Sequence, residues 1–476
     1  LYSYTVRSTE MSGFEAKKDY TSELKAAIPE SVTIANERGI EEAIVILLSL
    51  EKKCRLANDS NNLKEVCIHM VRLCREKSNW VKLNSVLAVI NKRDALNKAV
   101  IIAVVNEAKS YIDMTPTVDE RIELIKALKD VCDGKIYVEG ESAGFHFMLS
   151  KIYESRGDIE AACDIIQDVH VETYGSLSKQ EKANYILEQM RVTLVKKDYI
   201  RALIHSRKMN VKTLEEGGFE DIKIRYYKMM VWYHLVDKNS WEVCQAYYKI
   251  ASTAQPTAVV SSGEGMDVVP AEDPVATKAH VDLQKHALES AILFLLASKF
   301  DNHQSDMMHR LKNQLLEQFK GLPIDPLYGN ALRLFTTHEI VPTPFPGQDA
   351  LETHSSLNCS DHLTEENASL FRKQLRDRVV QHNLRVVARY YTRVRSGRLA
   401  ELLGLDYDTL EVHLSEIAAG GDLYLKIDRP AGIVSFHERP QPEQVLSDWA
   451  SDVGKMLQLM EATCHIINRE NMVYKV

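Results

Sequence analysis

Residues 379–436 read VVQHNLRVVARYYTRVRSGRLAELLGLDYDTLEVHLSEIAAGGDLYLKIDRPAGIVSF. They predict three helices followed by a hairpin. Apolar residues recur at helical spacing across residues 378–391, which indicates the first helix. Ser396 can cap a short second helix, which Gly404 ends. Asp406 can cap the third helix, so the second and third form a helix-turn-helix.

A hairpin completes this arrangement. Gly420 and Gly421 end the third helix. Residues 423–427 then alternate between apolar and polar side chains, as a half-buried strand does. Turn residues fill 428–432, and Ile433 to Phe436 form a short apolar return strand. Three helices and a hairpin in this order predict a winged helix.

The third helix of this module is acidic. Winged helices that bind DNA usually insert the second helix of the turn into the major groove. Here that helix carries carboxylates and, over residues 406–419, no Lys or Arg: Asp406, Asp408, Glu411 and Glu416. A phosphate backbone needs cations at its contacts. The module is therefore expected to contact protein rather than nucleic acid.

Composition fits a folded protein in a reducing compartment. The 476 residues are 45% hydrophobic and 26% charged, and the net charge is -8. Eight cysteines occur without a CxxC pair, and Cys54, Cys67 and Cys74 lie in helical patterns as expected buried thiols. No apolar run is long enough to span a bilayer, so we expect no membrane contact. Residues 1–20 have the polar character of a loose leader.

A helical repeat precedes the winged helix. A turn residue followed by a helix start recurs at Gly39, Asn79, Gly157, Asp198 and Asn239, at intervals of about 40 residues or twice that. Paired helices with this period predict an α-solenoid. The expected organisation is a solenoid at 21–254, a loop at 255–280, helices at 281–340, a linker at 341–362, the winged helix at 363–437 and a tail helix at 442–476.

The tail helix carries a heptad stripe. Between residues 446 and 467 its a and d positions are apolar except for Thr463, and they comprise Leu446, Trp449, Val453, Met456, Met460 and Ile467. Such a stripe is typical of a coiled coil or a helical bundle. The helix either folds back on its own domain or joins helices of other chains. A lone helix exposing Trp449 and two methionines would be an aggregation liability, which favours the second interpretation.

A basic stripe crosses the first helix of the winged helix. Arg378, Arg385, Arg389 and Arg393 follow each other at steps of seven, four and four residues. Such a stripe is usually a solvated face or pairs with neighbouring carboxylates. Docking on an acidic partner or contact with RNA are the functional alternatives. RNA is disfavoured because no aromatic side chain interleaves the stripe.

The sequence contains no recognisable catalytic motif. HExxH, P-loop, GxSxG and Rossmann patterns are absent. His303, Asp306 and His309 share a helical neighbourhood, but their polar surroundings indicate a solvated helix start rather than a metal site. We therefore expect neither a cofactor nor a metal, and no enzymatic activity.

The order of repeat, winged helix and tail helix resembles PCI-domain proteins, and in particular the PCI subunits of the 26S proteasome lid. The phrases that are similar are HVETYGS (170–176), YILEQM (185–190), LFTT (334–337), HNLRV (382–386) and RPAGIV (429–434). The resemblance runs from about Lys17 to the C-terminus. Pro342 and Pro344 stand where the family continues a helix.

This resemblance implies a mostly α fold: a right-handed α-solenoid of helical hairpins, a winged-helix (PCI) module and a C-terminal bundle helix. It also implies a non-catalytic scaffold, cytoplasmic and nuclear, in which winged helices join in an arc. The implied partners are other PCI lid subunits, the lid deubiquitinase subunit, the ATPase ring and the core particle. Ile433, Val434 and Phe436 are expected at an exposed sheet edge that extends a neighbour's sheet. The alternatives are a PCI subunit of the signalosome or a winged-helix protein associated with RNA or DNA.

Overall fold

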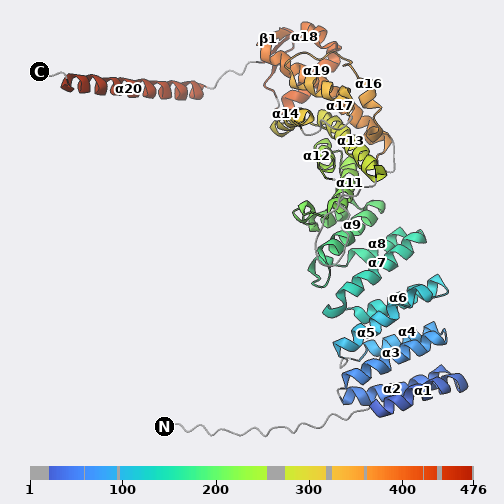
Figure 1. Ribbon diagram of the computed structural model, residues 1–476. Coiled ribbons are helices and arrows are strands. Elements are labelled where there is room, and N and C mark those ends of the chain that lie inside the picture. Colours follow the sequence, from blue (N-terminus) through green and yellow to red (C-terminus); the bar gives the residue numbers. More distant parts are fainter. Residues whose placement is uncertain are drawn as a thin grey trace. The chain divides into compact units, whose positions relative to one another are not determined.

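The computed structural model is mostly helical (Figure 1). It describes residues 21–57, 59–93, 97–254, 274–317, 324–358, 362–421, 423–436 and 442–473. These divide into two compact units, with the boundary between Met229 and Met230. The expected mostly α fold, with a helical solenoid before a winged-helix module, is confirmed.

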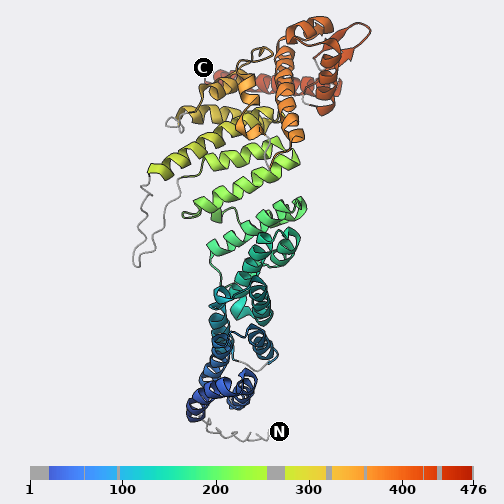
Figure 2. The same ribbon diagram turned by 90° about the vertical axis from the view of Figure 1, so that its right-hand side faces the viewer.

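Unit 1 is a stack of helical hairpins. Its hairpins follow one another in chain order, blue to green in Figures 1 and 2. Its elements are α1 (Thr21–Glu37), α2 (Ile40–Leu56), α3 (Ser60–Glu76), α4 (Trp80–Asn91), α5 (Lys98–Lys109), η1 (Ile112–Met114), α6 (Val118–Cys132), η2 (Ile136–Val138), α7 (Glu139–Ser155), α8 (Ile159–Gln167), η3 (Val171–Thr173), α9 (Lys179–Val195), α10 (Tyr199–Lys208), η4 (Thr213–Glu215) and the first half of α11 (Glu220–Asp237).

The recurring turn phrase is the joint inside five of the hairpins. One residue of every joint has a positive φ: Gly39, Ser78, Gly157, Lys197 and Lys238. The next main-chain N–H donates to a carbonyl five residues back in four of the joints, for example Asn79 to Cys74 at 3.0 Å. An Asn or Asp then caps the second helix in three joints. Left-handed closure followed by an N-cap reverses the chain within three residues.

One hairpin lacks this phrase. Between Gly39 and Gly157 the phrase appears only once, at Asn79, although the spacing allows two. The structure places α5 and α6 in the gap and joins them through η1. This longer connection buries Ile112, and Thr117 caps α6. The repeat therefore continues through the gap with a different joint.

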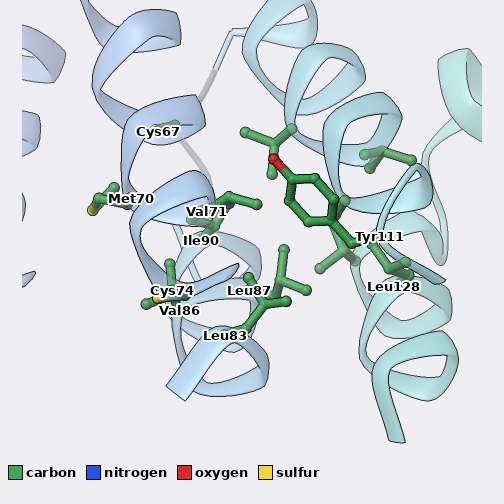
Figure 3. Close-up of a cluster of buried hydrophobic side chains, with 14 of the residues drawn as sticks. Cys67, Met70, Val71, Cys74, Leu83, Val86, Leu87, Ile90, Tyr111 and Leu128 are labelled. Atoms are coloured by element: carbon green, nitrogen blue, oxygen red, sulfur yellow. The ribbon is translucent and has the colours of Figure 1, made fainter. Parts of the chain in front are cut away.

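The core of unit 1 lies between neighbouring hairpins. Figure 3 shows Val71 of α3 and Leu87 of α4 in one cluster with Tyr111 and Leu128, which belong to the next hairpin. Tyr111 is 2% exposed, and its hydroxyl donates to Glu107 Oε1 at 2.7 Å. A buried phenol needs such a partner. Each hairpin thus buries its apolar face only by stacking on the next.

Unit 2 holds the winged helix and the helices before it. Its elements after α11 are α12 (Ser240–Ala251), α13 (Pro274–Ala297), α14 (Asn302–Glu317), α15 (Pro326–Thr336), α16 (Gln348–Glu352), η5 (Ser355–Leu357), α17 (Glu365–Tyr390), β1 (Arg393–Arg395), α18 (Ser396–Leu403), α19 (Tyr407–Gly420), β2 (Lys426–Asp428), β3 (Ile433–Ser435) and α20 (Pro442–Val473).

The three strands of the winged helix run antiparallel in the order β1-β3-β2. Val434 pairs with Val394 on one side and with Ile427 on the other. The expected edge position of the 433–436 strand is therefore wrong, because β3 is the central strand. Val434 is 0% and Phe436 8% exposed, and both pack in the core with α17, α18 and α19. The hydrophobicity of this strand reflects burial.

Two expected helix caps also differ. Ser396 is the first residue of α18, and its hydroxyl donates to the carbonyl of Gly432 at 3.2 Å, which ties the helix to the β2–β3 turn. Asp406 precedes α19, but its side chain makes no capping hydrogen bond. Both helices begin where the sequence indicates, although neither side chain caps its helix.

The segment expected as a linker at 341–362 is packed in its described part. Val341, Phe345, Leu351 and Leu357 are buried, and α16 and η5 lie within it. Asn383 of α17 holds its start: Oδ1 accepts from the Val341 N–H, and Nδ2 donates to the Val341 carbonyl, both at 2.8 Å. This side chain pairs with the main chain as a strand would. α15 ends at Thr336, before Pro342 and Pro344, and the segment that carries these prolines stays packed.

Candidate interaction surfaces

The apolar stripe of α20 is exposed. None of the described residues of this helix is buried. Among the six stripe residues the exposed fraction runs from 40% for Val453 to 67% for Trp449. Exposed apolar surfaces of this extent are typical of regions that contact another protein.

The apolar face of α20 is wider than the a and d positions. Leu457 lies at an e position, and Leu459 and Ile466 lie at g positions, all at least half exposed. Sequence reasoning missed these three residues, although the heptad register would have placed them. A two-stranded coiled coil covers mainly a and d. A face that adds e and g fits a helix with neighbours on two sides.

The sheet of the winged helix offers main-chain groups at both edges. Phe436 N–H donates to Thr392 O at 3.0 Å, and Ser396 N–H donates to Gly432 O at 2.8 Å. Hydrogen-bonded pairs alternate along an antiparallel ladder. The main chain of Arg393 and Arg395 therefore faces away from β3. By the same alternation, the main chain of Ile427 faces outward on β2.

The helix α19 presents carboxylates and two exposed apolar side chains. Glu411 is held by the β2–β3 turn, since Arg429 Nε lies 2.6 Å from its Oε1. Tyr407 and Val412 are 42% and 55% exposed. The side of the module that binds DNA in other winged helices thus carries negative charge and apolar surface.

The basic stripe is divided between contacts inside unit 2 and exposed positions. Arg378 Nε donates to the carbonyl of Ala297 at 3.4 Å. Arg385 lies over the ring of Phe300, with its Cζ 3.8 Å from the ring centroid. Arg389 is exposed, and α17 ends at Tyr390, so Arg393 lies in β1 instead of continuing the helical stripe.

Two arginines that precede the stripe pair with the 341–357 segment. Arg376 Nε donates to Glu352 Oε1 at 2.8 Å, and this contact lowers the pKa of Glu352. Arg372 donates to the main-chain carbonyls of Glu352 and Leu357. Part of the basic charge of α17 thus holds α16 and η5 in place. A charged stripe commonly pairs in this way with a neighbouring element of the same chain.

The cysteines singled out in the sequence are buried, and the candidate metal residues are exposed. Cys54, Cys67 and Cys74 are buried, as predicted, and burial raises the pKa of Cys67 to about 12. His303 and His309 are exposed. Across the described residues, no cluster of His, Cys, Asp and Glu has the arrangement needed to hold a metal ion. Within the same residues, no helix combines the length and the apolar character of a membrane span.

Three family models match consecutive parts of the chain. A model described as PSMD12/CSN4, N-terminal, matches residues 42–258. The PCI domain model matches residues 351–438. The model of the 26S proteasome regulatory subunit RPN5 C-terminal domain matches residues 443–475, which are essentially α20. The N-terminal model is described by two protein names, PSMD12 and CSN4, whereas the C-terminal model is described by RPN5 alone. The C-terminal match therefore points to a single kind of protein.

Curated relatives align over nearly the whole chain. The 26S proteasome non-ATPase regulatory subunit 12 of Dictyostelium discoideum is 34% identical over 453 residues, covering 94% of this chain and 93% of the relative. The 26S proteasome regulatory subunit RPN5 of Saccharomyces cerevisiae is 31% identical and covers 97% of both. An Arabidopsis thaliana homologue of subunit 12 is 32% identical, covering 92% of this chain and 98% of the relative.

Proposed function

Because the chain belongs to the family of 26S proteasome non-ATPase regulatory subunit 12, also named RPN5, we propose that it is a non-catalytic scaffold of the proteasome lid. In this role it supports ubiquitin-dependent protein degradation through contacts between PCI domains and between bundled helices. The names of the relatives describe regulatory and non-ATPase subunits. The signalosome alternative loses ground because these relatives are named as proteasome subunits.

The exposed face of α20 carries this proposal. Six stripe residues and the flanking e and g residues leave an apolar surface with no cover in the described chain. The C-terminal model of a proteasome subunit matches this same helix. We propose that α20 enters a bundle with the terminal helices of other PCI subunits and of the deubiquitinase subunit. Neighbours on two sides would cover positions a, d, e and g.

The sheet edges supply a second contact. An arc of similar domains needs two different surfaces on each member, one for each neighbour. The winged helix has two edges with outward main-chain groups, β1 with two arginines and β2 with Lys426 and Asp428. Charged side chains discourage unspecific pairing at such edges and favour complementary partners. We propose these edges in place of the buried 433–436 strand.

The test compares charges placed on opposite faces of α20. Met456→Glu with Met460→Glu puts carboxylates into the a and d stripe. Ser451→Glu with Gln458→Glu adds the same charge at f positions and serves as the matched control. Each tagged full chain is expressed in cells, and the size and composition of its assembly are measured. We expect the stripe variant to be lost from the large assembly and the control to remain.

Two outcomes would argue against the proposal. One is incorporation of the stripe variant at the control level. The other is a wild-type chain that purifies alone, without other proteasome subunits. Circular dichroism of the purified variants checks that the solenoid and the winged helix stay folded, which is expected because α20 buries none of its described residues.

The proposal extends to the solenoid and to the location. We propose that unit 1 reaches toward the ATPase ring and the core particle, and that the chain works in the cytoplasm and the nucleus. Cross-linking mass spectrometry of the purified assembly tests the first point through the lysines of unit 1. Cross-links from these lysines that lead only to other lid subunits would contradict it, and fractionation of cells would test the location.

A further inference from the structure

The helix α10 of unit 1 exposes apolar side chains between cations. Ile200 is 77% and Ile204 52% exposed, and they lie four residues apart, which places them on one side of the helix. Arg207 is exposed three residues further along the same side. Exposed residues in the joints before and after α10 add further positive and apolar side chains. We call this surface the α10 face, and it comprises Lys197, Ile200, Ile204, Arg207, Val211 and Lys212.

The neighbouring pair of isoleucines sets α10 apart from the other helices of unit 1. Single exposed apolar side chains are ordinary on protein surfaces. α2 exposes Val45 and Leu56, which lie far apart along the helix, and α4 exposes Val81. Within the described part of unit 1, α10 is the one helix in which two large apolar side chains are exposed one turn apart. An apolar surface with a polar border is typical of a contact with another protein.

The positive charge of the α10 face is left over after the local ion pairs have formed. Residues 196–212 hold six Lys and Arg and a single carboxylate, Asp198. Three carboxylates around α10 already engage cations outside the face, in the ion pairs Asp164–Lys196 at 2.9 Å, Glu172–Lys208 at 3.2 Å and Asp198–Arg201 at 3.4 Å. The three cations of the face make no ion pair with any described residue. Their charge is therefore available to a partner.

The chemistry of the α10 face selects its partner. Two aliphatic side chains one turn apart match apolar side chains at the same spacing on an amphipathic helix. Cations at both ends of the face match carboxylates that flank those apolar side chains. The six residues of the face include no aromatic side chain on which an RNA base could stack, and no Trp or Phe of the kind that anchors a helix at a membrane surface. An acidic protein segment is the occupant that fits both the apolar and the charged part.

We propose that the α10 face binds an acidic amphipathic helix of another protein. Apolar side chains of that helix cover Ile200 and Ile204, and its carboxylates pair with Lys197 and Arg207. The surface lies in unit 1 and shares no residue with α20 or with the sheet edges. The contact forms with the purified chain, so it does not depend on the proposed scaffold role.

The test measures the binding of two labelled peptides to the purified full-length chain by fluorescence anisotropy at low ionic strength. Each peptide has about 14 residues, enough for about four helical turns, and carries leucines along one face. Glutamates flank the leucines in the acidic peptide, and lysines replace them in the basic peptide. We expect saturable binding of the acidic peptide, at least tenfold tighter than that of the basic one. Added salt should weaken this binding, because it screens exposed charges.

Two double variants assign the surface. Ile204→Ser with Arg207→Glu removes an apolar side chain and reverses a cation of the α10 face. Leu56→Ser with Lys52→Glu makes the same kinds of change at exposed positions of α2 and serves as the matched control. The α10 variant should bind the acidic peptide about tenfold more weakly or worse, because it loses both an apolar contact and a charge pair. The α2 variant should bind it as the wild type does.

The proposal fails if the acidic peptide does not bind, if both peptides bind equally, or if the α2 variant loses as much affinity as the α10 variant. Unchanged affinity in Ile204→Ser alone would also overturn it, since the contact would then rest on charge without an apolar component. Binding of single-stranded RNA or of phosphatidylserine vesicles in place of the acidic peptide would reassign the surface to a polyanion. Thermal unfolding of each variant shows whether a loss of binding comes from a loss of fold.

Discussion

Replacing Asn383 with alanine should loosen the segment that joins α15 to α16. The side chain is 1% exposed and satisfies both main-chain groups of Val341, which is itself 2% exposed. Its removal leaves one buried N–H and one buried carbonyl without a partner. At about 1–3 kcal/mol for each unsatisfied group, the loss comes to about 2–6 kcal/mol. Local opening of residues 337–347 would limit the loss, so we expect the lower half of this range.

Hydrogen exchange measured by mass spectrometry can localise the effect. Peptides spanning residues 337–347 should exchange faster in Asn383→Ala, while peptides of α3 and α4 should not change. Asn367→Ala is the matched control, because its amide makes a single, longer bond of 3.3 Å to the carbonyl of Leu235. The control should lose about 1 kcal/mol. Equal protection of 337–347 in wild type and Asn383→Ala would refute the reasoning.

Three further predictions concern a hairpin joint, the pH dependence of stability and the ion pair between the β2–β3 turn and α19. Gly157→Ala should destabilise unit 1 by about 1 kcal/mol in denaturant unfolding, because φ is 87° at this position. Gly144→Ala, in open space within α7, should instead stabilise unit 1 by up to about 1 kcal/mol. A change of the same sign in both variants would contradict this reasoning. Burial lowers the pKa of His205 to about 4, so the folded chain should lose stability as pH falls from 6.5 toward 4, by up to about 3 kcal/mol. In His205→Asn, the free energy of unfolding should change less between pH 6.5 and pH 4 than in the wild type. The same slope in both proteins would contradict a role for His205. Arg429→Ala breaks an exposed pair with Glu411 and should cost under about 1 kcal/mol in thermal unfolding, with a larger loss counting against the assignment of this pair as a surface contact.

Local signals in the sequence predicted the elements of this fold well. Positive-φ joints leave a visible phrase because few residues suit a left-handed turn followed by an N-cap, so Gly157 and Asn79 could be recognised. The heptad of α20 is equally readable, because the repeat lies within one continuous helix. The winged helix followed from the order of its helices and turns.

Tertiary pairing was beyond the reach of such signals. A short apolar strand such as Ile433–Ser435 has the same pattern at the centre of a sheet and at its edge, and only the pairing with β1 and β2 separates the two cases. The packing of the 341–357 segment depends on Asn383, which lies 42 residues away in sequence.

The stacked hairpins of unit 1 have a mechanical consequence. Every extensive pairing among α1 to α10 joins helices one or two places apart in the chain. In such a stack, small changes of tilt between successive hairpins add up along the chain. The bending stiffness of the whole stack is therefore expected to fall as the number of hairpins rises.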